Sequence, residues 1–334
     1  MRIPFLTGSY ARPDEEGVCL IELDTEQNRL IKVDGWRGFN NPSYLIHDGT
    51  KEHLFIVEEL TPEGNVLSAG FAGRQLTVRQ RLSSHGADPC HLCLWPDGKT
   101  LVVCNYTDGS FATYQVDRDG LLTTVQTEKL IGGSVHPQRQ ERAHMHFSAF
   151  RGGKAWLVDL GSDSLYVSPA EEDSGRIRQE RQTIQLPPGT GPRHFAFGEE
   201  GFLYIVSELH NEICVLRPSG DGYTLIQRVN TVPEGTGGLA AAIRIQDQRL
   251  FVSNRGEDSI AMYQIREDGT IQWLDSCPTG GRVPRDFEVV GRHIIVCNQE
   301  SSLLTVLEID SERESLRQTE LSLPLPRPTC VCLL

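Results

Sequence analysis

DPCHLCLWPDGKTLVVCN, residues 88–105, contains two short apolar segments joined by a turn. The first segment, residues 89–94, begins with a proline. The second, residues 100–105, is rich in β-branched side chains and ends on the polar Asn105. Asp97-Gly98 lies between them and is a strong turn signal. The stretch therefore predicts two neighbouring antiparallel strands.

The same layout recurs in five further segments: residues 41–58, 143–159, 191–208, 238–255 and 283–298. In each copy the second apolar segment ends in a polar residue. The copies follow one another at roughly 45–55 residues, which suits a four-stranded blade of a β-propeller. Helical periodicity is nearly absent and β-branched runs with turn signals are frequent, which argues against a helical repeat.

The two ends of the chain supply a seventh copy in two parts. Residues 327–334 resemble a first strand with nothing after it, and residues 4–10 resemble a second strand with nothing before it. Pairing of the two ends would close a ring and remove an exposed sheet edge. We expect an all-β fold: one seven-bladed β-propeller of four-stranded antiparallel blades, spanning residues 1–334. The alternatives are an open β-solenoid or two separate sandwiches.

The composition narrows the class of partner and the compartment. A formal net charge of −13 argues against nucleic acid or an anionic membrane as the main partner. The nine cysteines lie mostly in apolar runs, and the single CxxC pair, Cys90 and Cys93, has no second ligand motif. We expect buried thiols, a cytoplasmic protein, no metal ion and no cofactor. Oligomeric state stays open between a monomer and a weak homo-oligomer.

Ionisable residues recur at one corner of the predicted blades. The start of a first strand lies beside the end of the antiparallel second strand, and the ring places this corner of every blade on the same rim of the channel. The strand starts contribute His91, His144, His146, Arg193, His194 and Arg285. The strand ends contribute Glu58, Glu59, Asn105, Tyr106, Asp159, Glu208, Asn254, Arg255, Asn298 and Gln299. Alternation of side chains groups His144 with Arg193 and Arg285 as channel-facing residues, with His146 on the face of His144.

We expect structural roles for some of these residues and functional roles for others. Bonds to turn backbone are favoured over function for Asn105, Asp159, Asn254 and Asn298. The two roles are balanced for Glu58, Glu59, His91 and His194. Function is favoured for His146, Arg193, Glu208 and Arg255, because two arginines beside a carboxylate and an imidazole have little structural purpose on a rim.

At these positions the sequence resembles the lactonase family of seven-bladed propellers, which contains 6-phosphogluconolactonases and carboxy-muconate cyclases. The resemblance rests on short segments spread over almost the whole chain: Cys104–Tyr106, His144–His146, Asp159–Gly161, Gly191–His194, Ser207–Leu209, Ser253–Arg255 and Pro284–Phe287. It implies a catalytic group of one histidine, His144 or His146, with Arg193, Glu208 and Arg255. His91, Asn105, His194, Arg285 and Asn298 are expected to contact the substrate.

The resemblance implies hydrolysis of a small anionic sugar lactone, foremost 6-phosphogluconolactone in the pentose phosphate pathway. His146 or Glu208 could take a proton from water, and Arg193 or Arg255 could stabilise the oxyanion. Arg285 is a candidate to hold a phosphate. No GxSxG motif is present, which argues against an acyl-enzyme. The alternatives are a lactonising cycloisomerase of the muconate type and a non-catalytic binding propeller.

Overall fold

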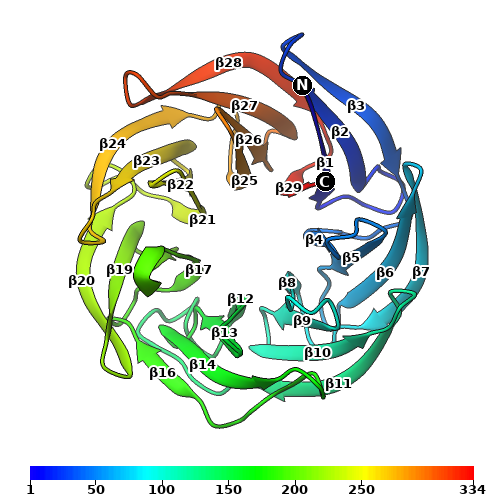
Figure 1. Cartoon of the computed structure of the whole chain (residues 1–334), viewed down its shortest axis with the longest axis vertical. Coiled ribbons are helices and arrows are strands. Elements are labelled where there is room, and N and C mark those ends of the chain that lie inside the picture. Colours follow the sequence, from blue (N-terminus) through cyan, green and yellow to red (C-terminus); the bar gives the residue numbers. More distant parts are fainter.

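Each repeat of the sequence folds into one antiparallel sheet, and seven such sheets surround a central axis (Figure 1). The computed structural model describes residues 1–334. Apolar β-branched runs form the middle strands of each blade, where both faces are buried against neighbouring blades. The prediction of a seven-bladed propeller with four-stranded antiparallel blades is confirmed.

Three blades come from the first half of the chain, and each begins with its innermost strand. The first of them consists of β4 (Leu45–His47), β5 (His53–Glu58), β6 (Asn65–Ala72) and β7 (Gln75–Ser83). The second consists of β8 (Pro89–Leu94), β9 (Thr100–Asn105), β10 (Ser110–Val116) and β11 (Leu122–Lys129). The third consists of β12 (Met145–Arg151), β13 (Lys154–Asp159), β14 (Ser164–Glu171) and β16 (Gln182–Gln185), and short β15 (Arg176–Ile177) also pairs with β14.

Three blades of the second half repeat the same order. The first consists of β17 (Pro192–Phe197), β18 (Leu203–Ser207), β19 (Glu212–Ser219) and β20 (Gly222–Asn230), with the short 3-10 helix η1 (Glu199–Gly201) after β17. The second consists of β21 (Leu239–Gln246), β22 (Arg249–Arg255), β23 (Ser259–Ile265) and β24 (Ile271–Pro278). The third consists of β25 (Pro284–Val290), β26 (His293–Asn298), β27 (Leu303–Asp310) and β28 (Ser315–Pro324).

The seventh blade joins the two ends of the chain, as the sequence predicts. Its strands run in the order β29 (Pro328–Leu333), β1 (Arg2–Ser9), β2 (Val18–Asp24) and β3 (Arg29–Trp36). Phe5 pairs with Leu333 and Thr7 pairs with Val331, so the last strand of the chain closes the ring beside the first (Figure 1). Closure satisfies the backbone groups that an open sheet would expose.

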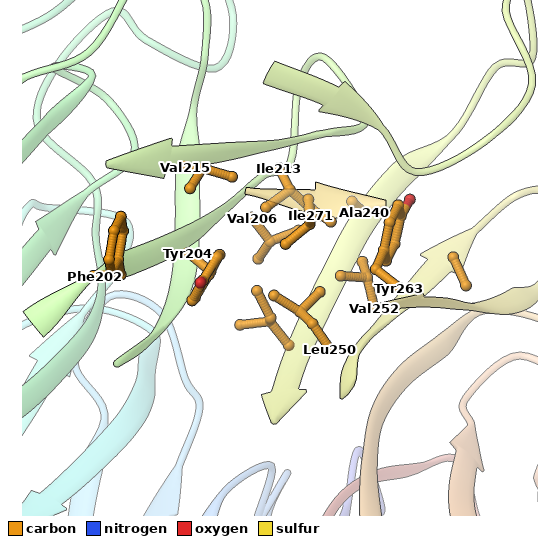
Figure 2. Packing of buried hydrophobic residues seen from close by; sticks show 12 residues of the cluster. Phe202, Tyr204, Val206, Ile213, Val215, Ala240, Leu250, Val252, Tyr263 and Ile271 are labelled. Atoms are coloured by element: carbon orange, nitrogen blue, oxygen red, sulfur yellow. The ribbon is translucent and has the colours of Figure 1, made fainter. Parts of the chain in front are cut away.

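The hydrophobic core is divided into clusters between adjacent blades. One cluster of 12 buried residues joins the β17–β20 blade to the β21–β24 blade (Figure 2). Leu250 and Val252 meet Val206 across this interface, and all three are fully buried. Tyr204 donates its hydroxyl hydrogen bond to the carbonyl of Gly269 at 2.9 Å, which satisfies its polar atom inside the apolar layer. None of the chain's helical structure has the length and hydropathy needed to cross a bilayer.

All inner strands except β4 carry a β-bulge in their pairing with the second strand of the blade, and these bulges determine which residues face the axis. Pro192 pairs with Ser207 and His194 pairs with Val206, which leaves Arg193 as the extra residue. The same irregularity isolates Arg285 in β25. A bulge redirects a side chain that regular pairing would place on the other face of the sheet. The equivalent residues of successive blades are therefore brought together at one depth of the channel.

Candidate functional site

The centre of the candidate site is a buried carboxylate surrounded by three guanidinium groups. Glu208 follows β18 directly, and its side chain is 3% exposed. Its Oε2 lies 2.8 Å from Nη2 of Arg255 and 3.1 Å from Nε of Arg193, while Oε1 contacts Nη2 of Arg139. Burial opposes ionisation of Glu208, but the three arginines outweigh burial and hold its pKa well below its usual range. Glu208 is therefore an anion at neutral pH and a weak proton acceptor.

The backbone of β21 positions two of these arginines. Arg193 donates from Nη1 to the carbonyl of Ala241 at 2.9 Å. Arg255 donates from Nη2 to the carbonyl of Ala240 at 3.1 Å. The arginines are thus held by fixed main-chain acceptors as well as by Glu208.

Arg139 reaches Glu208 from outside the repeat. It lies in residues 130–144, the longest connection between strands, which links β11 to β12. Arg139 also donates to the hydroxyl of Tyr106, from Nη2 at 3.0 Å and from Nε at 3.3 Å. The repeat pattern does not include this residue, and only the unusual length of the connection singles out the segment. Sequence reasoning therefore missed it.

His146, and not His144, occupies the bulge position that Arg193 and Arg285 share. Met145 pairs with Asp159 and Phe147 pairs with Val158, so His146 is the extra residue of β12. The sequence pattern grouped His144 with the two arginines because each arginine follows a proline, whereas His146 follows Met145. The structure corrects that grouping by two residues: the histidine equivalent to Arg193 and Arg285 is His146.

The two histidines have different surroundings. His144 stacks on Tyr106 and places Nδ1 2.9 Å from the Tyr106 carbonyl oxygen. The ring of His146 lies 5.6 Å from that of Tyr106 and 5.3 Å from that of His194, and its buried Nδ1 has no hydrogen-bond partner. Burial, followed by the positive charge of Arg193, holds the His146 pKa well below its usual range. His146 is therefore neutral at neutral pH and has a nitrogen free to accept or donate a proton.

A second polar group faces the site from the other side of the channel. Tyr10 donates to Oε1 of Glu59 at 2.7 Å, and the guanidinium of Arg285 lies over the Tyr10 ring and 4.0 Å from the same oxygen. Glu59, Arg285, Cys90 and Arg193 line one cavity of about 10 Å³. A cavity of this size accommodates about one water molecule. The cavity links the Arg285 group to the Glu208 group.

The structure does not bring three of the proposed substrate contacts to the site. Asn105 donates to the Ser84 carbonyl and to Ser110, and Asn298 donates to Thr305; both amides are fully buried within their blades. These bonds join strands and turns, as the sequence favoured for this residue type. His91 is packed against Tyr44 and Phe147 and lines a separate cavity of about 510 Å³ formed by later residues of the inner strands.

His194 lies between these two levels of the channel. Its Nε2 is 3.2 Å from Nη1 of Arg193, and its ring packs against Phe147. Burial is the main cause that lowers its pKa well below the usual range, so the ring is neutral and Nε2 accepts from Arg193. His194 is buried and lines the same small cavity as Arg193 and Arg285, so the structure brings this predicted residue to the site.

A buried carboxylate supports the segment that leads into β12. Asp159 accepts backbone hydrogen bonds from His144 at 2.7 Å and from Gly161 at 2.9 Å. A Cβ at position 161 would lie 1.8 Å from the carbonyl oxygen of Arg142, so only glycine fits there. Asp159 and Gly161 therefore fix the backbone on which both site histidines are mounted.

The site is locally positive although the whole chain is negative. Three guanidinium groups surround the single carboxylate of Glu208, which leaves two net positive charges. Burial and the neighbouring Arg255 and Arg285 lower the pKa of Arg193 to about 9, a sign of positive charge without full compensation. Such an arrangement attracts an anion and can stabilise negative charge that develops during a reaction. No group of three or more His, Cys, Asp or Glu side chains is arranged to hold a metal ion.

Comparisons with known proteins agree with this architecture. A family model described as "Lactonase, 7-bladed beta-propeller" matches residues 4–333. A 6-phosphogluconolactonase of Bacillus subtilis is 29% identical over 97% of this chain and 96% of its own length, and one of Formosa agariphila is 29% identical over 90% and 91%. The solved structure of a periplasmic gluconolactonase from Pseudomonas aeruginosa is 27% identical, with a TM-score of 0.92 over 100% of this chain and 99% of its own.

Proposed function

The chain belongs to the seven-bladed β-propeller lactonase family and is an enzyme of that type, and on this premise we propose that it hydrolyses an anionic sugar lactone, with 6-phosphogluconolactone as substrate and 6-phosphogluconate as product. The observation that carries the proposal is the cluster of Arg139, Arg193 and Arg255 around a single carboxylate. Two surplus positive charges suit an anionic substrate. The names of the Bacillus subtilis and Formosa agariphila relatives favour the phosphorylated sugar.

Lactone hydrolysis requires a water molecule to attack the carbonyl carbon. In our proposal the neutral imidazole of His146 accepts a proton from that water, since the carboxylate of Glu208 is occupied by contacts with three arginines. The carbonyl oxygen becomes an oxyanion, which Arg193 and Arg255 stabilise from fixed positions. The ring C–O bond then breaks, and His146 returns the proton to the departing ring oxygen, which becomes the free hydroxyl of the sugar acid.

Glu208 has a supporting role in this scheme. It holds Arg193 and Arg255 in place and prevents three cations from repelling one another. Arg285 is held by Glu59 and Tyr10 on the opposite side, where it can contact a hydroxyl or carbonyl of the sugar. The nine cysteines form no disulfide, which supports our assignment to a reducing compartment such as the cytoplasm.

A pH-stat assay tests the proposal. The purified protein is given 6-phosphogluconolactone, unphosphorylated gluconolactone and a muconolactone, and the spontaneous rate is subtracted. We expect hydrolysis of the sugar lactones, fastest with the phosphorylated one, and an Arg193→Ala variant slower by at least ~100-fold in kcat/KM. Arg249→Ala is the control and should keep full activity, because Arg249 is a half-buried residue at the start of β22 that bonds to Ser311 at the surface. No hydrolysis above the spontaneous rate, or full activity in Arg193→Ala, would refute the assignment.

A further inference from the structure

Arg139 differs from the other two arginines of the Glu208 cluster in its exposure and its origin. Its side chain is 31% exposed, against 4% for Arg193 and 11% for Arg255. It is mounted on the connection of residues 130–144, whereas the other two extend from strands. Arg139 therefore forms the outermost part of the positive site, nearest to solvent.

The backbone beside Arg139 is firmly anchored. The neighbouring Gln140 is 1% exposed and donates from Nε2 to Oδ1 of Asp163 at 2.7 Å and to the carbonyl of Leu160 at 3.0 Å. Its own carbonyl accepts from the backbone of Ser134 at 2.8 Å. The connection thus presents Arg139 from a fixed point, and rotation of its side chain does not require the segment to unfold.

The donors of Arg139 are not committed to main-chain acceptors. Arg193 and Arg255 each bond to a carbonyl of β21, but Arg139 bonds only to the side chains of Glu208 and Tyr106. Its Nη1 has no partner within the chain and remains available. An anion with several oxygens could bind this free edge of the Arg139 guanidinium group and replace Glu208 as its partner. Arg193 and Arg255 would continue to neutralise Glu208.

We infer that Arg139, with the hydroxyl of Tyr106, forms the subsite for the phosphate group of a phosphorylated sugar lactone. This inference rests on the proposed function. In the proposed mechanism the lactone carbonyl points to the buried arginines and His146. The phosphate is carried by the exocyclic carbon, on the other side of the ring oxygen from the carbonyl, and in this orientation it points outward. Arg139 is the arginine of the cluster at that end. Tyr106 accepts from Arg139 and keeps its own O–H to donate to a phosphate oxygen.

The test compares two substrates in three proteins. Wild type, Arg139→Ala and Arg142→Ala are assayed with phosphorylated and unphosphorylated gluconolactone. Arg142 is the matched control because it lies three residues away in the same connection, is 57% exposed and pairs only with Glu141. We expect Arg139→Ala to raise KM for the phosphorylated substrate about 10- to 100-fold, with little change in kcat. Its kcat/KM for the unphosphorylated substrate should fall much less, so that the ratio of the two kcat/KM values drops at least ~10-fold, and Arg142→Ala should resemble wild type.

An equal loss with both substrates, or no loss with either, would overturn the subsite. Calorimetry with 6-phosphogluconate and gluconate separates this outcome from failure of the proposed function. If wild type hydrolyses neither lactone but binds 6-phosphogluconate more tightly than gluconate, and Arg139→Ala removes the difference, the subsite stands and the reaction is wrong. If wild type hydrolyses both lactones and Arg139→Ala binds 6-phosphogluconate normally, the reaction stands and the subsite is wrong.

Discussion

Replacing Glu208 with glutamine removes the one negative charge at the centre of the arginine cluster and changes the shape of the side chain very little. The variant leaves Arg193 and Arg255 buried without a counter-ion, since their side chains are 4% and 11% exposed. Removing one partner of a buried ion pair costs about 3–5 kcal/mol. Arg139 is 31% exposed and adds little, because solvent screens its charge.

This loss should be visible in thermal unfolding. An unfolding entropy of about 2.1 cal/mol/K per residue gives roughly 0.7 kcal/mol/K for 334 residues, so Tm should fall by about 4–7 °C in Glu208→Gln. Glu212→Gln is the control: Glu212 pairs with the half-exposed Arg228 near the surface, and its Tm should change by less than about 2 °C. Calorimetry at low ionic strength measures both variants.

The destabilisation caused by Glu208→Gln should depend on pH. The arginines hold the pKa of Glu208 well below its usual range, so its stabilising effect is complete above the unfolded value of about 4.3 and disappears as pH falls below it. The difference in Tm between wild type and Glu208→Gln should be constant from pH 5 to 7 and shrink below about pH 4. Added phosphate should raise the Tm of the variant more than that of wild type, because the variant site carries one more net positive charge. An unchanged or higher Tm in the variant at pH 7 would refute this account of the cluster.

Two further predictions concern the proton carrier and the core. His146→Gln should lower kcat at least ~100-fold, and the wild-type rate should show no inflection near pH 6.5, because burial beside Arg193 keeps His146 neutral to well below that pH; a pH–rate profile with a step near 6.5 would contradict this role. Leu250→Ala should lower the free energy of unfolding by about 2–5 kcal/mol, because Leu250 is fully buried between two blades; a denaturation midpoint equal to that of wild type would show that the interface does not depend on it.

Most of the fold was predictable because the signals for it are local. A short first strand, a tight turn and an apolar second strand recur along the chain, and three of the turns are Asp-Gly or Gly-Gly, at residues 48–49, 97–98 and 152–153. The hydrogen bonds of an antiparallel pair need little more than that pattern. The incomplete copies at residues 4–10 and 327–334 also predicted closure of the ring, which the pairing of β1 with β29 confirms. Repetition then placed Arg193, Glu208 and Arg255 at equivalent corners, and the structure brings these three side chains together.

The details of the site depended on contacts that no repeat encodes. A bulge in β12 places His146, and not His144, at the position equivalent to Arg193, and this bulge arises where β12 pairs with β13 without a proline. Asn105 and Asn298 have the residue type of a ligand contact, but pairing across the blade uses their amides internally.

The sequence by itself determined the number of blades, their strand order and the closure, because each depends on local periodicity and on turn chemistry. Only the tertiary structure decided which charged side chains share a space and how strongly they perturb one another. Arg139 illustrates the reason: it is brought to Glu208 by a long connection whose path depends on Gln140 packing against the next blade. Electrostatic coupling depends on distance and burial in three dimensions, and neither can be obtained from spacing along the chain.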